Sequence, residues 1–225
     1  MTTHDLEVLR RFSTPTISNA LERLGLAQRE QRYTDSTIRC MFPELGSIVG
    51  YACTLLIRSA APCQSPRYSS RKPYWDHILA APSPRILVSQ DLDDPPRGAY
   101  FGEVNGNIHR ALGCVGVITN GFVRDLDEVR MMGFPFYGSA VSVSHAYCHL
   151  EDFNQPVTVG GMMVRPGEVI HADRHGAMVI PAEFLPRVAA AALAIEHYER
   201  PMIQLCKSPE FSTERLAELL RNEGV

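Results

Sequence analysis

The segment that decides the fold reads Gly113-Cys114-Val115-Gly116-Val117-Ile118-Thr119-Asn120-Gly121-Phe122-Val123-Arg124-Asp125-Leu126-Asp127-Glu128. Its first half is an apolar run rich in β-branched residues, which predicts a buried strand over 114–119. Asn120-Gly121 is a turn signal, and the run from Asp125 to Glu128 resembles a capping box that would open a helix ending at Gly133. A strand, a turn and a helix N-terminus therefore follow one another at once, which is typical of an α/β fold.

The amino-terminal side extends this α/β pattern. Thr14-Pro15 predicts the start of a helix, with an N-cap followed by proline, and Gly25 predicts its end. The Pro- and Ser-rich segment Ser59–Pro73 is too long for a simple connection and predicts a lid or a binding loop. The other elements expected here are strands at 47–57 and 86–91, a helix at 74–80, and a helix from Gly102 to Gly113 with Val104, Ile108, Ala111 and Leu112 on its apolar side.

The carboxyl-terminal half predicts short strands followed by helices. Turn signals such as Gly160-Gly161 and Pro166-Gly167 separate its apolar runs. A long helix is expected to start at Pro186 and to kink or end at Pro201, and a last helix is expected to start at Ser212. The expected strands are 134–137, 140–145, 156–159, 162–164, 168–171 and 177–180.

Composition and charge are those of a globular protein of 225 residues and 25.0 kDa. Lys and Arg number 22 against 25 Asp and Glu, so the net charge of -3 disfavours nucleic acid or an anionic membrane as a partner. The most apolar run, Val188 to Ile195, is shorter than the roughly 20 residues of a membrane span, and the N-terminus lacks a signal pattern. These features predict a cytoplasmic protein with one domain over residues 1–225 and free cysteines.

Three charged residues form the candidate site, namely Glu103 near the start of one predicted helix, and Arg124 and Asp125 at the junction of the next strand and helix. The 20 residues between Glu103 and Arg124 are enough for one helix and one strand, which would return the chain to the same edge of the sheet. An arginine beside a carboxylate suits an anionic substrate held on a divalent cation such as Mg²⁺. An ion pair beside a helix cap is the alternative interpretation of the same pattern.

Three motifs together resemble the RraA-like family, which includes the metal-dependent 4-hydroxy-4-methyl-2-oxoglutarate aldolases. The first is Gly102-Glu103 followed by Arg124-Asp125, the second is Thr16–Leu21, and the third is the strand-turn-strand segment Val164–Pro181. The resemblance implies an α/β fold of the β/β/α swivelling type, similar to the phosphohistidine domain, with C-terminal helices. It also implies a homotrimer or homohexamer with active sites at the subunit interfaces.

The resemblance implies roles for individual residues as well. Asp125 would ligate Mg²⁺ or Mn²⁺, and Glu103 would reach that metal through water. Arg124 would bind the substrate, and both Arg124 and Glu103 would take part in catalysis. The backbone that would meet the substrate carboxylate is that of Gly102, Val104 and Asn105. The candidates for a further carboxylate from a neighbouring subunit are Glu196 and Glu199.

The reaction that the resemblance implies is the cleavage of a 4-hydroxy-2-oxo acid to pyruvate. The metal and Arg124 would stabilise the enolate that remains when the carbon-carbon bond breaks. If the leaving fragment is carbon dioxide, the same site is an oxaloacetate decarboxylase. In either case the partner is a small 2-oxo acid. The alternative is a non-catalytic regulator, because the family also includes proteins that inhibit a ribonuclease by protein-protein contact.

Histidines supply the remaining candidates. His145, at the end of a predicted strand, could orient substrate or act as an acid or base near neutral pH. The pairs His145/His149 and His171/His175 have the spacing of zinc ligands, but in strands or turns this spacing does not bring two imidazoles together. Surface or interface positions are therefore favoured for them over a zinc site. The positions that depart from the family pattern, and could change the substrate, are Asn19, Ser59–Pro73 and Ser144–Tyr147.

Overall fold

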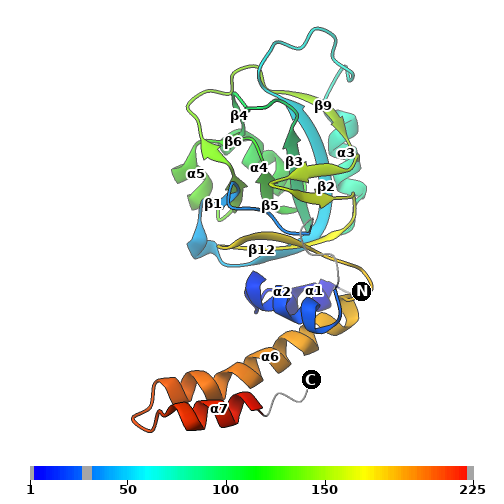
Figure 1. Ribbon diagram of the computed structural model, residues 1–225. Coiled ribbons are helices and arrows are strands. Elements are labelled where there is room, and N and C mark those ends of the chain that lie inside the picture. The colour runs from blue at the N-terminus through cyan, green and yellow to red at the C-terminus, as the bar shows by residue number, and fades with distance from the viewer. Residues whose placement is uncertain (1–2, 27–31, 222–225) are drawn as a thin grey trace.

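The computed structural model, which describes residues 3–26 and 32–221, is built around an eight-stranded mixed sheet (Figure 1). Four of its strands run parallel in the spatial order β2-β3-β5-β7, and β1 closes that edge antiparallel to β7. Their bounds are β1 Arg39–Cys40, β2 Ile48–Arg58, β3 Arg85–Asp91, β5 Cys114–Thr119 and β7 Phe136–Gly138.

The other edge of β2 is shared by two antiparallel strands. Residues 48–51 of β2 pair with β12 (Val169–Asp173), which pairs in turn with β13 (Gly176–Ile180). Residues 55–58 of β2 pair with β9 (His149–Phe153), and the register shifts between Leu56 and Ile57. Because β2 has partners on both edges and is buried along most of its length, it needs the continuous apolar sequence that it has.

The remaining strands form two small sheets. β4 (Ala99–Phe101), β6 (Phe122–Val123) and β8 (Ala140–Val141) form a parallel three-stranded sheet with β6 in the middle. β10 (Val157–Val159) and β11 (Met162–Val164) form an antiparallel hairpin, whose turn is Gly160-Gly161 as predicted.

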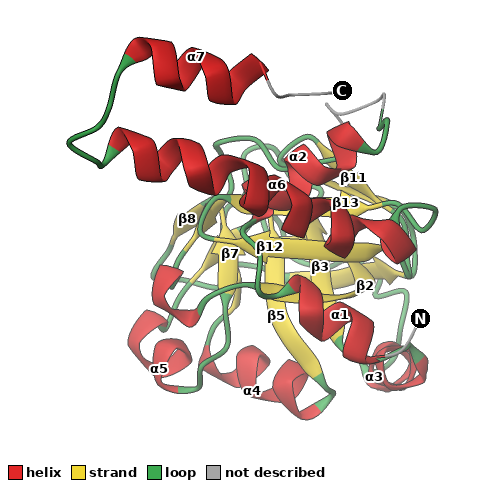
Figure 2. Cartoon of the chain, turned by 90° about the horizontal axis from the view of Figure 1, so that it is seen from below, coloured by secondary structure: helices red, strands yellow, loops and turns green. Residues whose placement is uncertain are grey.

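Helices lie on two sides of the strands (Figures 1 and 2). α1, α2 and the first part of α6 pack beside β12 and β13, whereas α3, α4 and α5 lie around the parallel strands. The rest of α6 extends away from the body, and α7 packs on it (Figure 1). Their bounds are α1 Thr3–Leu9, α2 Thr14–Arg23, α3 Lys72–Ala80, α4 Glu103–Ala111, α5 Leu126–Met131, α6 Leu185–Cys206 and α7 Thr213–Arg221, with a 3₁₀ turn at Pro43–Leu45.

The buried apolar side chains form three clusters. The first joins α2 to α6 and the β12–β13 hairpin through Ile17, Leu21 and Val188, among others. The second fills the space between the large sheet and the β10–β11 hairpin. The third is rich in aromatic rings, such as Tyr74 and Phe101, and lies under α3, α4 and α5. This third cluster supports the edge of the molecule that carries the candidate site.

The expected mixed α/β fold with C-terminal helices is confirmed, and several strands begin and end within two residues of their predicted bounds. The division into a single domain over 1–225 and the phosphohistidine-like label stay predictions. No helix among the residues described here is both long enough and apolar enough to cross a membrane.

Three expectations about helices were wrong. The N-cap of α2 is Ser13, whose hydroxyl accepts the Thr16 N–H at 3.2 Å, because the Thr14 hydroxyl is bonded instead to Nδ1 of His171 at 2.9 Å. The α4 helix does not bury the expected apolar side, since Val104 is 71% exposed and the buried positions are Gly106 and His109. Of the kink or end expected at Pro201, the end was wrong, because α6 continues through Pro201 to Cys206, and the kink stays a prediction.

The strand predicted over 140–145 was also wrong in its extent. β8 stops at Val141, and β9 forms over 149–153, where no strand was expected. Tertiary pairing explains both differences, because β8 has only the two-residue β6 as partner, whereas β9 finds the long edge of β2.

The α2–α6 contact leads to a stability prediction. Leu21 is fully buried there, so Leu21→Ala should lower the free energy of unfolding by about 2–5 kcal/mol through lost burial and a residual cavity. Leu193→Ala on α6, where the side chain is 44% exposed, is the matched control and should change the free energy by less than about 0.5 kcal/mol. Urea unfolding followed by circular dichroism measures both, and equal effects would contradict the packing described here.

Candidate functional site

Asp125 holds the start of α4 rather than the start of its own helix. It follows β6 in the left-handed backbone conformation (φ 54°, ψ 48°), and its carboxylate makes no cap bond to α5. Instead its Oδ2 atom accepts the backbone N–H of Glu103, the first residue of α4, at 2.9 Å. The capping box predicted at Asp125–Glu128 was therefore wrong, although α5 does begin at Leu126. A carboxylate at this place also interacts favourably with the dipole of α4.

Gly102 makes this contact possible. A Cβ atom at position 102 would lie 2.3 Å from Asp125 Oδ2 and 2.9 Å from Arg124 Cγ, which no side chain could tolerate. The backbone N–H of Arg124 also donates to the Phe101 carbonyl oxygen at 2.9 Å, so β4 and β6 hold the two segments side by side. The motif pair Gly102-Glu103 and Arg124-Asp125 is thus a single packing unit.

His145 reaches the same place from a turn. The Ala99 N–H donates to the Ser144 carbonyl oxygen at 2.9 Å, which ties this turn to β4. Gly98 permits the approach, because a Cβ there would lie 2.4 Å from the His145 carbonyl oxygen. Ala146 adopts a positive φ of 44° directly after it. The Ser144–Tyr147 turn, which departs from the family pattern, therefore supplies one wall of the site through His145.

A cavity of about 270 Å³ collects the predicted residues. Of the residues singled out from the sequence, it is lined by Gly102, Val104, Asn105, Arg124, Asp125 and His145. Glu103 is the exception, because its side chain is exposed and only its backbone amide takes part. The lining residues for which no site role was predicted are Arg71, Ala99, Tyr100 and Cys148.

The residues around the cavity carry opposite charges. Arg124 Nε lies 3.5 Å from Asp125 Oδ2, and both side chains are about one third exposed (34%). Burial raises the pKa of the Cys148 thiol to about 12, so this cysteine is a neutral wall residue and not a nucleophile at neutral pH. Residues in the first turn of α4 have no intrahelical acceptor for their N–H groups, which leaves those of Val104 and Asn105 able to bind an anion.

A buried hydrogen-bond chain supports the cavity wall from below. Tyr74 on α3 donates its hydroxyl proton to His109 Nε2 at 2.8 Å, and His109 Nδ1–H donates to the Asn105 carbonyl oxygen at 2.6 Å. Burial lowers the pKa of His109 to about 4, so its imidazole is neutral at physiological pH, as this bonding requires. The chain fixes α3 against α4. The sequence predicted a helix over 74–80 but not this hydrogen-bond chain.

A divalent metal would find one suitable carboxylate here. No group of three or more His, Cys, Asp or Glu side chains in the described part of the chain could hold a metal ion. Mg²⁺ commonly keeps several water ligands and takes only one or two protein carboxylates. Asp125 fits such an ion, because the Glu103 N–H occupies Oδ2 and leaves Oδ1 as the oxygen that can ligate.

Three of the four paired histidines, all except His145, make polar side-chain contacts within the fold. His171 is buried between the Thr14 hydroxyl and the Leu9 carbonyl oxygen, and His175 contacts Asp173 at 3.1 Å. His149 lies 3.2 Å from Glu151. The expected surface or interface position was wrong for His171, because strand β12 places it in the core under α2.

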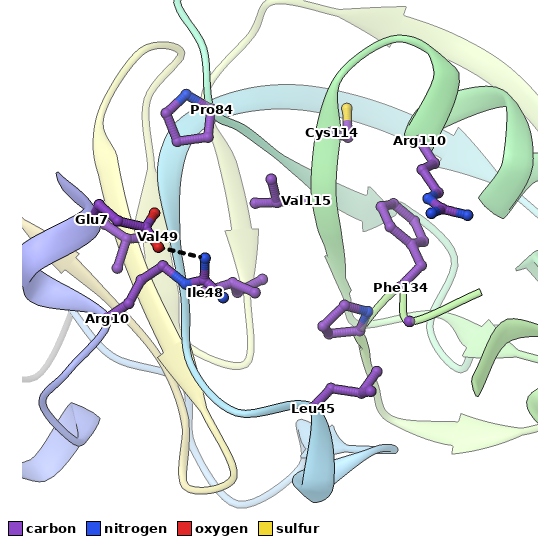
Figure 3. Close-up of a pocket in the computed structure, with 12 residues that line it drawn as sticks. Glu7, Arg10, Leu45, Ile48, Val49, Pro84, Arg110, Cys114, Val115 and Phe134 are labelled. Carbon is purple, nitrogen blue, oxygen red and sulfur yellow. Dashed lines mark hydrogen bonds and ion pairs between the residues drawn. The ribbon is translucent and has the colours of Figure 1, made fainter. Parts of the chain in front are cut away.

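Other cavities fit the chemistry less well. One of about 270 Å³ lies at the amino ends of the parallel strands (Figure 3). Its Arg10 is already bonded to Glu7 at 2.8 Å and to the Ser47 carbonyl oxygen, and Arg110 lies on the opposite wall. Another, of about 330 Å³, lies on α6 and is lined by Glu196 and Glu199. Within one chain these two carboxylates lie outside the site, and their role toward a neighbouring subunit stays a prediction.

Known proteins are similar to this chain in sequence. The model of the RraA-like family, described as Aldolase/RraA, matches residues 14–179. A protein of Ectopseudomonas mendocina named "Putative 4-hydroxy-4-methyl-2-oxoglutarate aldolase" is 30% identical over 112 residues, covering 42% of this chain and 67% of that protein. The Arabidopsis thaliana protein named "Putative 4-hydroxy-4-methyl-2-oxoglutarate aldolase 3" is 35% identical over 89 residues, covering 39% and 53%. The chain spans between 15% and 48% of the length of the first curated relatives that it matches.

Solved structures share the fold. An uncharacterized protein from Pseudomonas syringae pv. tomato has a TM-score of 0.75 at 23% identity, covering 98% of this chain and 94% of that chain. Streptomyces coelicolor RraAS2, described as an unusual member of the RNase ES inhibitor RraA protein family, has a TM-score of 0.70 at 22% identity, covering 89% and 96%. At such identities the likeness shows the fold alone.

The buried histidine predicts how stability depends on pH. The folded pKa of His109 is about 4 and its ordinary value is 6.5, so between these pH values the unfolded chain takes up a proton that the folded chain does not. Stability should therefore fall as the pH drops from 6.5 to 4, by about 3 kcal/mol from this residue. His109→Gln should flatten the pH dependence of the unfolding midpoint in this window. His197→Gln, which removes an exposed histidine, is the control, and identical slopes in all three proteins would contradict the assignment.

Proposed function

This chain belongs to the RraA-like family, and from that premise we propose that it is a divalent-metal-dependent lyase that cleaves a 4-hydroxy-2-oxo acid to pyruvate. The observation that carries the proposal is the convergence of Arg124, Asp125, the first turn of α4 and His145 on one cavity. A cation, a carboxylate, unpaired backbone donors and a titratable base are the groups that this reaction needs in one place. Decarboxylation of oxaloacetate belongs to the same proposal, because it leaves the same enolate.

Arg124 and α4 bind the substrate carboxylate in this proposal. The Val104 and Asn105 N–H groups and the Arg124 guanidinium are donors on the same cavity, so an anion between them would be bound from two sides. Arg124 is held by the β4–β6 pairing and by Asp125, which limits its movement. Donors that are already oriented lose little entropy when negative charge develops on the substrate.

Asp125 would hold the metal, and its position is set by the Glu103 N–H. A bound Mg²⁺ or Mn²⁺ supplies a Lewis acid that polarises the keto and carboxylate oxygens of the substrate. Glu103, whose side chain is exposed at the start of α4, would act on that ion through water. The backbone N–H of Glu103 has a separate role, because it holds the Asp125 carboxylate in place.

His145 moves the proton in this proposal. It is the one histidine among the residues that line the cavity, and an imidazole is the side chain that most often transfers protons in enzymes. Retro-aldol cleavage needs a base that removes the proton of the C4 hydroxyl group, and the His145 imidazole can accept it. The C3–C4 bond breaks and the C4 fragment leaves as a carbonyl compound, while Arg124 and the α4 N–H groups stabilise the negative charge of the enolate that remains. The protonated His145 then returns the proton to C3 of the enolate, which gives pyruvate.

Assembly and cellular location form part of the same proposal. We expect a homotrimer or homohexamer in the cytoplasm, in which Glu196 or Glu199 on the extended α6 arm approaches the cavity of a neighbouring subunit. Light scattering on a size-exclusion column tests the assembly. A regulator that acts only by protein contact would need none of the cavity residues, so the activity test below also separates these two functions.

Pyruvate release is the first test. We expect turnover of 4-hydroxy-4-methyl-2-oxoglutarate or oxaloacetate, coupled to NADH oxidation by lactate dehydrogenase, that requires Mg²⁺ and stops with EDTA. Arg124→Ala should lower kcat/KM by about 10²–10³-fold, since it removes a charged donor to the reacting carboxylate. Arg130→Ala is the matched control, because Arg130 is an exposed arginine on α5 that pairs with Glu44. Turnover that survives in Arg124→Ala, or that is absent from the wild-type protein, would overturn the proposal.

A further inference from the structure

The Ser59–Pro73 segment is docked on the body of the protein at its second half. Arg67 forms an ion pair with Asp152 at 2.7 Å, and the Tyr68 hydroxyl donates to the same carboxylate at 2.7 Å. The Tyr68 ring also packs on Phe153, with ring centroids 5.1 Å apart. Strand β9, which carries both partners, thereby holds the segment beside the candidate site.

Arg71 is the residue that this segment brings to the cavity. Its guanidinium lies over the Tyr100 ring, 5.5 Å from the centroid, and an Nη1 donor lies 3.5 Å from the Asn105 side-chain oxygen. The Asn105 side-chain amide in turn donates to the Tyr100 carbonyl oxygen at 2.6 Å. All three residues line the cavity. Stacking on a ring and a bond to an amide orient an arginine without neutralising its charge.

The backbone at Arg71 is fixed from the other side. The Arg71 carbonyl oxygen accepts the Trp75 N–H in the first turn of α3. α3 is anchored to α4 by the buried bond from Tyr74 to His109. Arg71 therefore lies between two anchors, β9 before it and the α3–α4 contact after it, which set the position of its backbone, while its exposed side chain lines the cavity.

Arg124 and Arg71 differ in whether a carboxylate of the protein lies beside them. Arg124 lies 3.5 Å from the Asp125 carboxylate, whereas no carboxylate within the described chain forms an ion pair with Arg71. Burial and the positive charge of Arg71 both favour the neutral form of His109, which agrees with a cation that is not neutralised. The cavity is thus lined by a second positive charge besides that of Arg124.

We propose that Arg71 binds the distal carboxylate of the substrate and makes the site selective for 2-oxo dicarboxylates over 2-oxo monocarboxylates. This inference rests on the proposed function, in which Arg124 and α4 take the carboxylate next to the keto group. The second carboxylate of a dicarboxylate then meets the guanidinium over Tyr100. The purpose of the long Ser59–Pro73 segment is, on this account, to position a specificity residue.

Kinetics with paired substrates test the proposal. Arg71→Gln should lower kcat/KM for 4-hydroxy-2-oxoglutarate by about 10- to 100-fold, mainly through KM, because a charge-assisted contact is lost. The same variant should change kcat/KM for 4-hydroxy-2-oxopentanoate, which lacks the distal carboxylate, by less than about twofold. Lys72→Gln is the matched control, since it removes the neighbouring positive charge, which pairs with Asp76 outside the cavity. Equal losses for both substrates, or no loss for either, would overturn the role of Arg71.

Binding measurements separate this inference from the proposed reaction. Titration calorimetry with 2-oxoglutarate and with 2-oxobutyrate, in the presence of Mg²⁺, needs no turnover. If the wild-type protein turns over no substrate, a selective loss of 2-oxoglutarate binding in Arg71→Gln still supports the inference while the proposed function fails. Wild-type protein that binds neither acid, or that prefers 2-oxobutyrate, would refute the inference.

Discussion

The division of one edge of β2 between two strands sets the geometry of the molecule. β12 pairs with the first part of that edge and β9 with the last, while β3 pairs with residues 51–57 on the opposite edge. The β12–β13 hairpin can therefore carry α2 and α6 on one side, and β9 remains free to hold the Ser59–Pro73 segment on the other. The candidate site depends on the second half of this arrangement, because the segment that ends at Arg71 is anchored on β9.

A single carboxylate connects the remaining parts of the site. Asp125 belongs to the turn between β6 and α5, yet it binds the first amide of α4, and Gly102 leaves the space for it. This bond satisfies the N–H group of Glu103, and the next two residues, Val104 and Asn105, belong to the first turn of α4 and line the cavity. The same side chain therefore supports the helix and lies beside Arg124, and in the proposed function it would also ligate the metal. Combining these functions in one residue explains why the motif residues lie in such close contact.

Local sequence patterns were sufficient for many elements but not for the contacts between them. The run Cys114–Thr119 predicted β5, and Gly160-Gly161 predicted the β10–β11 turn, because strand propensity and turn chemistry act within a few residues. The capping box at Asp125 failed because a more distant amide competed for the same carboxylate. The expectation that Val104 lies on the buried side of α4 was wrong, because Val104 lies at the exposed opening of the cavity. The polar residue His109 is buried instead, and it is bonded to Tyr74.

The sequence by itself determined the fold class, the family and the set Gly102, Val104, Asn105, Arg124, Asp125 and His145, all of which line one cavity. Motif spacing carries that information, since a helix and a strand return the chain to the same edge of a sheet. Only the tertiary structure decided that Asp125 caps α4, that Glu103 acts through its backbone and that Arg71 reaches the cavity. These outcomes depend on contacts between residues more than twenty positions apart in the chain, and short-range propensities do not encode which distant partner a side chain will meet.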